Sequence, residues 1–431
     1  MKNIILLPIE ISARELFSKI LLSYKFAQKG CEIYIGDKQS INNFIKYAPG
    51  SIYFDKGYHK GVSDDFYNKL LSNNSSIVSL DEENAVDFKD FQQINLRFPD
   101  HILPKFENTY LWGKKQFSYL QQNRENFDQS KIFVTGHPRF ELLKNKYSDL
   151  YADEVGIIKN RHKKFILVNT NFGLGNNIKG EDFIIKNYGN RFPQIKSLIR
   201  YQEMQVQNFI NLCKDLSSLD KYNIILRPHP EENISTYKDS FSSYKNIQAI
   251  SEGSVIPWII SSELMIHHDC TTSIECGMLG KSSIAYTKDL DLSLTTDIPL
   301  RISYQFNSFD DIEEYIKNIS KMELKIDTSI LNDYFNFHES SIDNVVNHTL
   351  RINKPLTKMK NYFIYKYWSV IKFQLKTFLN KVDPLYEKKI KGLDDITIKS
   401  ILKKYNNIFE SNDSVNLKKI HKRLFKIYLD E

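Results

Sequence analysis

Short apolar runs alternate with helix-length stretches twice along the chain, and this alternation constrains the fold more than any other feature of the sequence. In the first series, Arg14–Lys29 has a helical pattern that ends at Gly30 and lies between two apolar runs. Strands that are separated by helices favour a parallel sheet with crossover helices. The runs that we predict as strands are Ile4–Leu7, Glu32–Ile35, Ser51–Phe54, Ile77–Leu80 and Lys131–Thr135.

A polar, charged stretch from residue 144 to residue 164 separates the first series from a second one. Two such series predict two doubly wound α/β domains that face each other across a cleft, with ligands beyond the carboxyl ends of the strands. We expect the first domain at residues 1–150, the second at residues 160–330 and a basic helical extension at residues 331–431. The predicted strands of the second domain are Phe165–Asn169, Asn223–Arg227, Ile247–Ile250, Leu264–His267 and Ser283–Tyr286.

The positive charge of the chain lies in its last part. Residues 351–431 contain 19 Lys and Arg against 8 Asp and Glu, a net charge of +11, and because the whole chain carries +7, residues 1–350 carry −4. This distribution argues against a nucleic-acid enzyme and predicts an anionic partner for the tail. The segment Asn361–Asn380 mixes aromatic residues with lysines, which suits a helix at an anionic membrane surface. A helix that packs on the body of the protein explains the same composition equally well.

Other features of the sequence predict a cytoplasmic protein. No run of about 18 uncharged apolar residues is present, so we expect no transmembrane helix. The first residues are typical of a buried strand rather than of a signal peptide. The four cysteines form no CxxC pair, which favours reduced thiols in the cytoplasm. We predict no cofactor.

The strongest local motif is RPHPE at residues 227–231, directly after an apolar strand. Its two prolines stiffen the loop, so Arg227 and His229 can present fixed hydrogen-bond donors toward a ligand. Guanidinium suits phosphate oxygens, and imidazole can donate to a phosphate or protonate a leaving group. The alternative is a turn in which His229 only caps the next helix.

A second motif, HHDCTTSIE at residues 267–275, follows another apolar strand and opens a helix. Thr271, Thr272 and Ser273 supply hydroxyls where a helix start exposes backbone N–H groups, which is a natural phosphate site. Glu275, in the first turn or so of that helix, could accept both hydroxyls of a ribose. Ordinary helix capping is the alternative for this motif alone. Two such loops at successive strand ends of one domain are more specific.

The two motifs together resemble the donor-binding half of a family of bacterial surface carbohydrate biosynthesis proteins. The segments that carry the resemblance are RPHPEE, HHDCTTSIECGMLGKSSIAY, IEISARELFSKILLSYKFAQKGCEIYIG, LWGKKQ, VTGHPRFELL and ILVNTNFG. They cover about residues 1–320 and are similar to glycosyltransferases of the GT-B type. Among these, the CMP-sugar enzymes that transfer Kdo or sialic acid hold the CMP moiety with an HP motif and a Ser/Thr motif.

The resemblance implies roles for residues of this chain. His229 and Pro230 match the HP motif, Thr271–Ser273 match the Ser/Thr motif, and Glu275 matches the acid that binds the donor ribose. Many relatives have one histidine before the hydroxyl run where this chain has His267-His268-Asp269, so it stays open which of these faces the cleft. We include His268 as a substrate-binding candidate. Adjacent histidines on a strand face opposite sides, which makes joint metal ligation awkward, so we predict no metal site.

Two further loops are candidates. The loop after the first strand holds Glu10, which we predict as the base that activates an acceptor hydroxyl, and Arg14, which we predict to bind substrate. A local ion pair between Glu10 and Arg14 is an equal alternative. The loop after the first strand of the second domain holds Asn169 and Asn171, which could approach the donor. A plain polar loop is nearly as good an explanation.

The function predicted from these features is glycosyl transfer from a nucleotide-activated donor to a bacterial surface polysaccharide. We prefer a CMP-activated Kdo or nonulosonate as donor and a glycan or lipid-linked glycan as acceptor, with no nucleic acid involved. The alternatives are a UDP-sugar 2-epimerase, a teichoic-type polyol-phosphate transferase, and a non-catalytic scaffold of a polysaccharide assembly complex.

Overall fold

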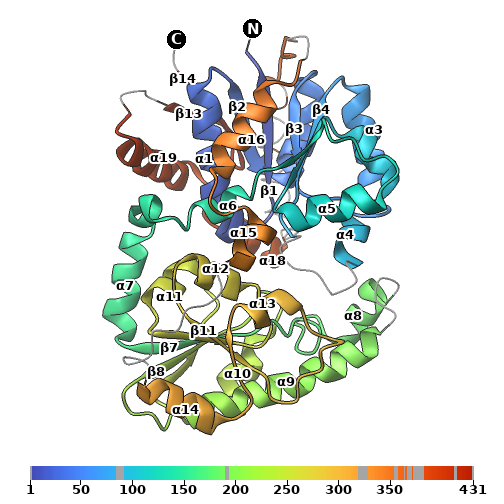
Figure 1. The fold of residues 1–431 in the computed structure, drawn as a ribbon. Helices are drawn as coiled ribbons and strands as arrows, with labels where there is room; N and C mark the ends of the chain where they lie inside the picture. Colours follow the sequence, from blue (N-terminus) through green and yellow to red (C-terminus); the bar gives the residue numbers. More distant parts are fainter. Residues whose placement is uncertain are drawn as a thin grey trace. The chain divides into compact units, whose positions relative to one another are not determined.

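The computed structural model describes residues 2–83, 92–189, 194–318, 329–353, 358–363, 365, 371, 383–411 and 415–429. The chain divides into two compact units, each a sheet flanked by helices (Figure 1). Of the described residues, unit 2 contains those from Tyr151 to Ile330. Unit 1 contains Met1–Ala85, Phe91–Leu150 and Leu331–Glu431, so the last part of the chain belongs to unit 1 in this division.

Unit 1 is built on an eight-stranded sheet with the order β13-β14-β2-β1-β3-β4-β5-β6. The strands β1 to β6 pair in parallel, as the alternation of strands and helices predicts. Every residue of β1 is buried, which is typical of a parallel strand with helices on both faces. The strands are β1 (Ile4–Ile9), β2 (Glu32–Asp37), β3 (Ile52–Asp55), β4 (Ser76–Leu80), β5 (Asn108–Leu111), β6 (Ile132–Val134), β13 (Val415–His421) and β14 (Leu424–Leu429).

The helices of unit 1 include the long helix α1, which follows β1 and buries Leu16, Ile20 and Phe26 against the sheet side. Its hydrophobic positions recur at helical spacing, which explains why the stretch was recognisable in the sequence. The described helices are α1 (Ser12–Gln28), α2 (Lys38–Phe44), α3 (Ser63–Ser72), α4 (Gln92–Arg97), α5 (Lys114–Asn123), α6 (Pro138–Glu141), α15 (Ser329–Phe335), α16 (Ser341–Leu350), α18 (Pro384–Lys389) and α19 (Asp395–Phe409).

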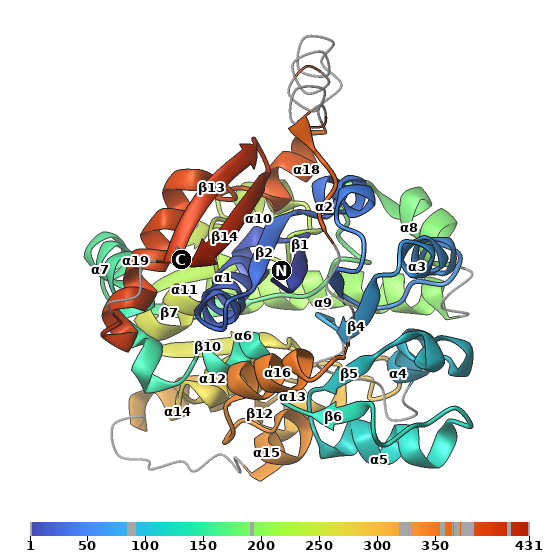
Figure 2. The same cartoon turned by 90° about the horizontal axis from the view of Figure 1, so that it is seen from above.

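The C-terminal extension is not wholly helical, which corrects the prediction for residues 331–431. β13 and β14 form an antiparallel hairpin, and β14 pairs antiparallel with β2 (Figure 2). The segment LFKIYL of β14 is rich in aliphatic and aromatic residues, which favour strands. At the pairing site, a Cβ on Gly36 of β2 would collide with the carbonyl oxygen of Arg423, so a glycine is needed there.

The start of the basic tail packs on unit 1. Tyr34 Oη donates to the sulfur of Met359 at 3.0 Å, and Tyr365 Oη donates to the carbonyl of Ser40 at 3.1 Å. All aromatic and lysine residues between 366 and 382 lie outside the described residues. The membrane contact of this segment therefore stays a prediction, which co-sedimentation of full-length and tail-deleted protein with anionic vesicles would test.

Unit 2 is built on a six-stranded parallel sheet with the order β12-β11-β10-β7-β8-β9. Its central strands carry apolar side chains such as Val168, Leu226 and Ile266, which are buried in one hydrophobic cluster with the long helix α9. The strands are β7 (Phe165–Asn169), β8 (Asn223–Arg227), β9 (Ile247–Ala249), β10 (Leu264–His267), β11 (Ser283–Tyr286) and β12 (Tyr304–Phe306).

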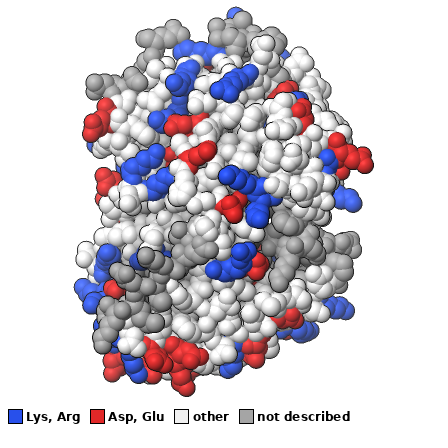
Figure 3. Space-filling model, in the orientation of Figure 1, with Lys and Arg blue, Asp and Glu red and all other residues white. Residues whose placement is uncertain are grey.

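The helices of unit 2 complete a doubly wound arrangement. They are α7 (Ala152–His162), α8 (Glu181–Tyr188), α9 (Ile195–Leu216), α10 (Ile234–Ser240), α11 (Ile256–Ser261), α12 (Thr272–Met278), α13 (Asp297–Arg301) and α14 (Phe309–Asn318). None of the helices in the described parts of the chain is long and apolar enough to cross a membrane. On the face of the molecule drawn in Figure 3, basic and acidic side chains are interspersed.

Candidate active site

The predicted site residues of unit 2 meet at one edge of its sheet. Asn169 ends β7, and it pairs with Arg227 at the end of β8 and with His267 at the end of β10. Ligands of doubly wound sheets bind beyond this carboxyl edge. The strand register therefore brings three loops that are distant in the sequence to neighbouring positions at the expected ligand edge.

Side-chain hydrogen bonds join the loop after β7 to the loop after β10. Asn169 Nδ2 donates to Thr272 Oγ1 at 3.0 Å, and Asn171 Nδ2 donates to Asp269 Oδ1 at 2.7 Å. Asp269 Oδ2 also accepts the backbone N–H of Thr296 at 2.9 Å. The two asparagines thus position the segment that carries the predicted hydroxyls.

Glu232, to which the sequence analysis gave no role, joins the loop after β7 to the loop after β8. Its Oε1 accepts from Thr170 Oγ1 at 2.8 Å, from the backbone N–H of Phe172 at 3.1 Å and from that of His229 at 2.8 Å. Its Oε2 accepts from the hydroxyl of Tyr237. Burial raises the pKa of this carboxyl although all four donors oppose the rise. Glu232 is the second acid of RPHPEE, two residues before α10, and its place next to the predicted HP motif was the signal that could have identified it.

Arg227 is engaged inside unit 2. Its guanidinium donates to the carbonyls of Glu252 and Gly253 at 2.8 and 3.1 Å and lies 4.9 Å from the ring of Trp258. Burial lowers its pKa to about 10, so the side chain is still charged at neutral pH. These contacts favour a role in fixing the loop after β9 rather than direct ligand contact.

The histidine pair is also internal. His268 is buried; its Nδ1 donates to the carbonyl of Tyr286 at 3.0 Å, and Tyr201 Oη lies 2.7 Å from its Nε2. His267 is buried as well, 2.8 Å from Ser303 Oγ, and burial lowers its pKa to about 3. These contacts therefore favour a role for both histidines in positioning the loop after β10 rather than in binding substrate. Within the described residues, no group of three or more His, Cys, Asp or Glu is arranged to hold a metal ion.

The remaining predicted residues of unit 2 differ in solvent exposure, and only the exposed side chains can contact a ligand. Ser273 is buried, and its hydroxyl donates to the carbonyl of Cys270 at 2.9 Å. The residues that reach the surface are His229, Pro230 and Thr271, which are exposed, and Asn171, Thr272 and Glu275, which are partly exposed.

The ring of His229 has a defined orientation. Its Nδ1 accepts the backbone N–H of Glu231 at 3.3 Å, so in this arrangement the ring hydrogen is on Nε2. Its own backbone N–H is held by Glu232. His229 therefore has Nε2–H as a donor at the carboxyl edge of unit 2.

In unit 1, Glu10 follows β1 and is bound by two lysines. Lys56 Nζ lies 3.1 Å and Lys38 Nζ 3.5 Å from Glu10 Oε2. Burial would raise the pKa of Glu10, but the charges of Lys56 and Lys38 outweigh it and hold the pKa at about 2. A carboxylate with so low a pKa is ionised but is a weak proton acceptor. The geometry therefore weakens the prediction that Glu10 is the base.

Within the described residues, Arg14 forms ion pairs with Glu15 and Glu83 rather than with Glu10. It lies 3.5 Å from Glu15 and 3.4 Å from Glu83. Glu15 also accepts the backbone N–H groups of Glu10 and Ile11 at 3.2 Å each, which closes the loop at the start of α1. The carboxylate of Glu15 thus fixes the backbone of the Glu10 loop.

A buried ionic group of unit 1 lies near this loop, and its members were not predicted as site residues. Glu82 and Lys19, whose side chains are both 1 % exposed, lie 3.1 Å apart, and His137 Nε2 lies 3.4 Å from the other carboxylate oxygen. Burial lowers the pKa of His137 to about 3, so the ring is neutral, while its Nδ1 accepts the backbone N–H of Arg139. The sequence signal that could have indicated this group is the acidic run DEE at residues 81–83, directly after the predicted strand that ends at Leu80.

We expect Glu10 to contribute to stability in a pH-dependent way. Because its pKa in the folded state is depressed, its contribution is full above the unfolded value near 4.5 and is lost as the pH falls toward 2. Urea unfolding measures the difference in free energy of unfolding between wild type and Glu10→Gln. This difference should shrink as the pH is lowered from about 5 to about 3. A difference that stays constant over this range would contradict the lysine pairing.

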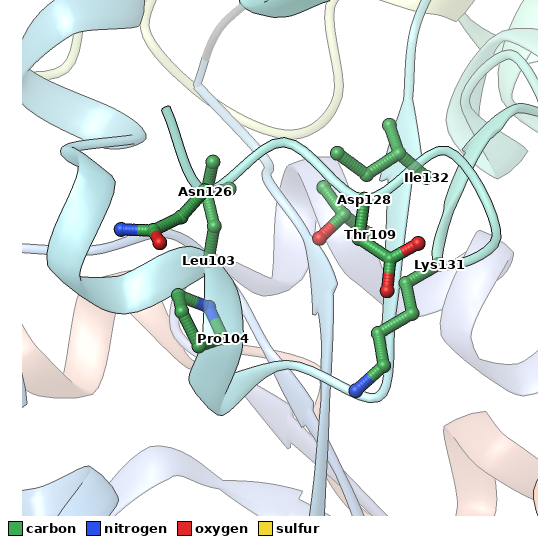
Figure 4. A pocket seen from close by; sticks show the side chains of 7 residues that line it. All are labelled: Leu103, Pro104, Thr109, Asn126, Asp128, Lys131 and Ile132. Atoms are coloured by element: carbon green, nitrogen blue, oxygen red, sulfur yellow. The ribbon is translucent and has the colours of Figure 1, made fainter. Parts of the chain in front are cut away.

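One described surface pocket lies away from these edges. It has a volume of about 240 Å³ and is lined by residues at the start of β5 and β6, such as Thr109 and Ile132 (Figure 4). Lys131 and Asp128 border it (Figure 4). Because Thr109 and Ile132 lie near the amino ends of their strands, the pocket is at the amino edge of the sheet of unit 1, opposite the edge that holds Glu10.

Comparisons with known proteins extend the description of the fold. No protein-family model and no curated protein matches the chain. The UDP-GlcNAc 2-epimerase of Methanocaldococcus jannaschii, in complex with UDP-GlcNAc and UDP, is similar with a TM-score of 0.51 and 11 % identity, over 81 % of this chain and 99 % of that chain. The wall teichoic acid polymerase TagF, in a variant soaked with CDPG, is similar with a TM-score of 0.50 and 14 % identity, over 81 % and 89 %. The fold is GT-B-like, with two Rossmann-like units.

Proposed function

We propose that the protein is an enzyme of surface-glycan assembly that transfers a sugar or polyol phosphate from a nucleotide-activated donor. The observation that carries this proposal is the set of hydrogen bonds that join the loops after β7, β8 and β10 at the carboxyl edge of unit 2. Loops braced in this way hold His229, Thr271 and Glu275 at the edge where ligands of such sheets bind.

The proposed chemistry is stabilisation of a leaving phosphate. Nε2–H of His229 donates to a phosphate oxygen, and the hydroxyl of Thr271 adds a further donor. The hydroxyl of Thr272 accepts from Asn169 Nδ2 and donates to Cys270 Sγ, so it positions the start of the helix. Donors held in place before the reaction lower the barrier because they need no reorganisation as charge develops. Glu275 accepts hydrogen bonds from the ribose hydroxyls.

For the donor, we propose a nucleoside diphosphate derivative in preference to the CMP-sugar expected from the sequence. One of the two similar structures was solved with UDP-GlcNAc and UDP and the other after soaking with CDPG. A donor with two phosphates also suits this edge, because the loop after β8 and the loop after β10 both offer hydrogen-bond donors.

A UDP-sugar 2-epimerase is the second candidate. It is favoured by the likeness to the archaeal epimerase, which extends over 99 % of that chain. It is also favoured by the low pKa of Glu10, because an epimerase needs no base for an acceptor hydroxyl. An epimerase changes the donor sugar itself, so its product forms without any acceptor.

The test is a donor panel of UDP-GlcNAc, CDP-glycerol and a CMP-sugar with product analysis. If the protein is a transferase, nucleotide release should depend on an added acceptor. If it is an epimerase, the C2 epimer should form, and the C2 hydrogen should exchange with D₂O, without any acceptor. The double variant Thr271→Ala/Thr272→Ala should weaken donor binding, whereas Ser242→Ala, an exposed hydroxyl after α10, should not. Absence of binding to every donor would overturn both candidates and favour the scaffold alternative.

A further inference from the structure

A buried chain of charged and polar side chains ends at His59, beyond β3 in unit 1. Asp81 binds Arg97 with both oxygens, to Nε at 2.6 Å and to one terminal nitrogen at 2.9 Å. The other terminal nitrogen of Arg97 lies 3.1 Å from His59 Nε2. Asp81 and Arg97 are buried, and His59 is half-buried.

The backbone of the β3 loop is shaped around this arginine. Arg97 donates to the carbonyls of Lys56 and Tyr58 at 3.2 and 3.4 Å. Gly57 has a φ of +124°, and a Cβ there would collide with the Arg97 guanidinium. The backbone N–H of His59 donates to Ser63 Oγ at 2.9 Å, which anchors the loop to α3.

The arginine decides where the hydrogen of His59 is. Guanidinium nitrogens only donate hydrogen bonds, so Nε2 of His59 must accept, and a neutral ring then carries its hydrogen on Nδ1. Burial lowers the pKa of His59, and the charges of Arg97 and Lys38 add to this effect while Glu83 and Asp81 oppose it. His59 is thus neutral at pH 7, with Nδ1–H as its donor.

We propose that His59 is a binding residue for the second substrate of the proposed transfer, and that its Nδ1–H donates to an uncharged sugar oxygen. The inference rests on the proposed function and adds to it that the acceptor binds to unit 1. His59 lies at the carboxyl edge of the sheet, where Glu10 and Glu83 also reach the surface, 40 % and 49 % exposed. The carboxylates engage the basic side chains of this edge, Lys56 and Lys38 with Glu10 and Arg14 with Glu83, which disfavours an anionic ligand and favours a neutral one.

Arg97 and Asp81 are positioning residues in this proposal, because they act through His59. They are unsuitable for the test, since removing one partner of a buried ion pair destabilises the fold. His59 itself offers matched variants. The amide nitrogen of Asn lies close to the position of Nδ1, whereas that of Gln lies close to the position of Nε2.

The first measurement is the ¹⁵N NMR spectrum of histidine-labelled full-length protein at pH 7. We expect a protonated Nδ1 and an unprotonated Nε2 for His59, assigned by its loss in His59→Gln. A hydrogen on Nε2 would overturn the proposal, whatever the enzyme's activity, so its failure can be told from failure of the proposed function.

The second measurement is titration with methyl N-acetylglucosaminide as a neutral probe and glucose 6-phosphate as an anionic one. We expect only the neutral probe to shift the His59 signal. Its affinity should fall about 3- to 10-fold in His59→Gln and stay within about 2-fold in His59→Asn, as for loss of one hydrogen bond. Equal affinities of the two variants, binding of the anionic probe alone, or no shift with either probe would overturn the proposal.

Discussion

Replacement of His229 by alanine should lower turnover by about 100-fold or more, the effect expected when one preorganised donor to a developing charge is lost. The fold should survive, because the side chain is exposed and the loop is held by Glu232 through the backbone N–H of His229. Turnover is measured with the donor that the panel identifies, and circular dichroism checks the fold.

The orientation of the ring provides a matched pair of controls. Since Nε2 is the donor, His229→Gln keeps an amide nitrogen near that position and should retain more turnover than His229→Asn. Equal losses in the two variants would contradict the assigned donor atom. Near-normal turnover of a folded His229→Ala protein would reduce the residue to a part of the turn.

Replacement of Glu82 by alanine should lower the free energy of unfolding by about 3–5 kcal/mol, the usual cost of leaving one partner of a buried pair uncompensated. Lys19 would be left buried with its charge, and His137 Nε2 would lose its carboxylate neighbour. Urea unfolding at pH 7 measures the change.

The neighbouring residue is the natural control. Glu83 is 49 % exposed, and its contacts with Arg14 and Arg97 are 3.4 and 3.8 Å long, so Glu83→Ala should cost less than about 1 kcal/mol. The double variant Lys19→Met/Glu82→Leu should recover part of the loss, because it removes both charges. A Glu82→Ala protein as stable as Glu83→Ala would contradict the burial of this ion pair.

Much of the fold was predictable because hydrophobic periodicity is local. The apolar runs from Ile4 and Phe165 became the first strands of the two sheets, and Arg14–Lys29 became most of α1. β5 was missed, since its sequence NTYL alternates polar and apolar residues too briefly to stand out. The hairpin of β13 and β14 was missed because lysines interrupt the apolar residues of VNLKKIH and LFKIYL, so neither strand forms a continuous apolar run.

The candidate site was predictable only in part. The sequence indicated which loops follow apolar strands, and the register of β7, β8 and β10 does bring them together. It could not indicate which way each side chain turns. Arg227 and His268 point into unit 2, and Glu10 is neutralised by two lysines from elsewhere in the chain.

By itself, the sequence determined two α/β series, the loops at their strand ends and the basic tail, because these depend on the order of residues along the chain. Only the tertiary structure decided that β14 extends the first sheet, that Glu232 ties two loops together, and that Arg97 sets the tautomer of His59. The physical reason is that burial, ion pairing and hydrogen-bond direction arise between residues far apart in the sequence. Such contacts produce no periodic pattern in the amino-acid sequence.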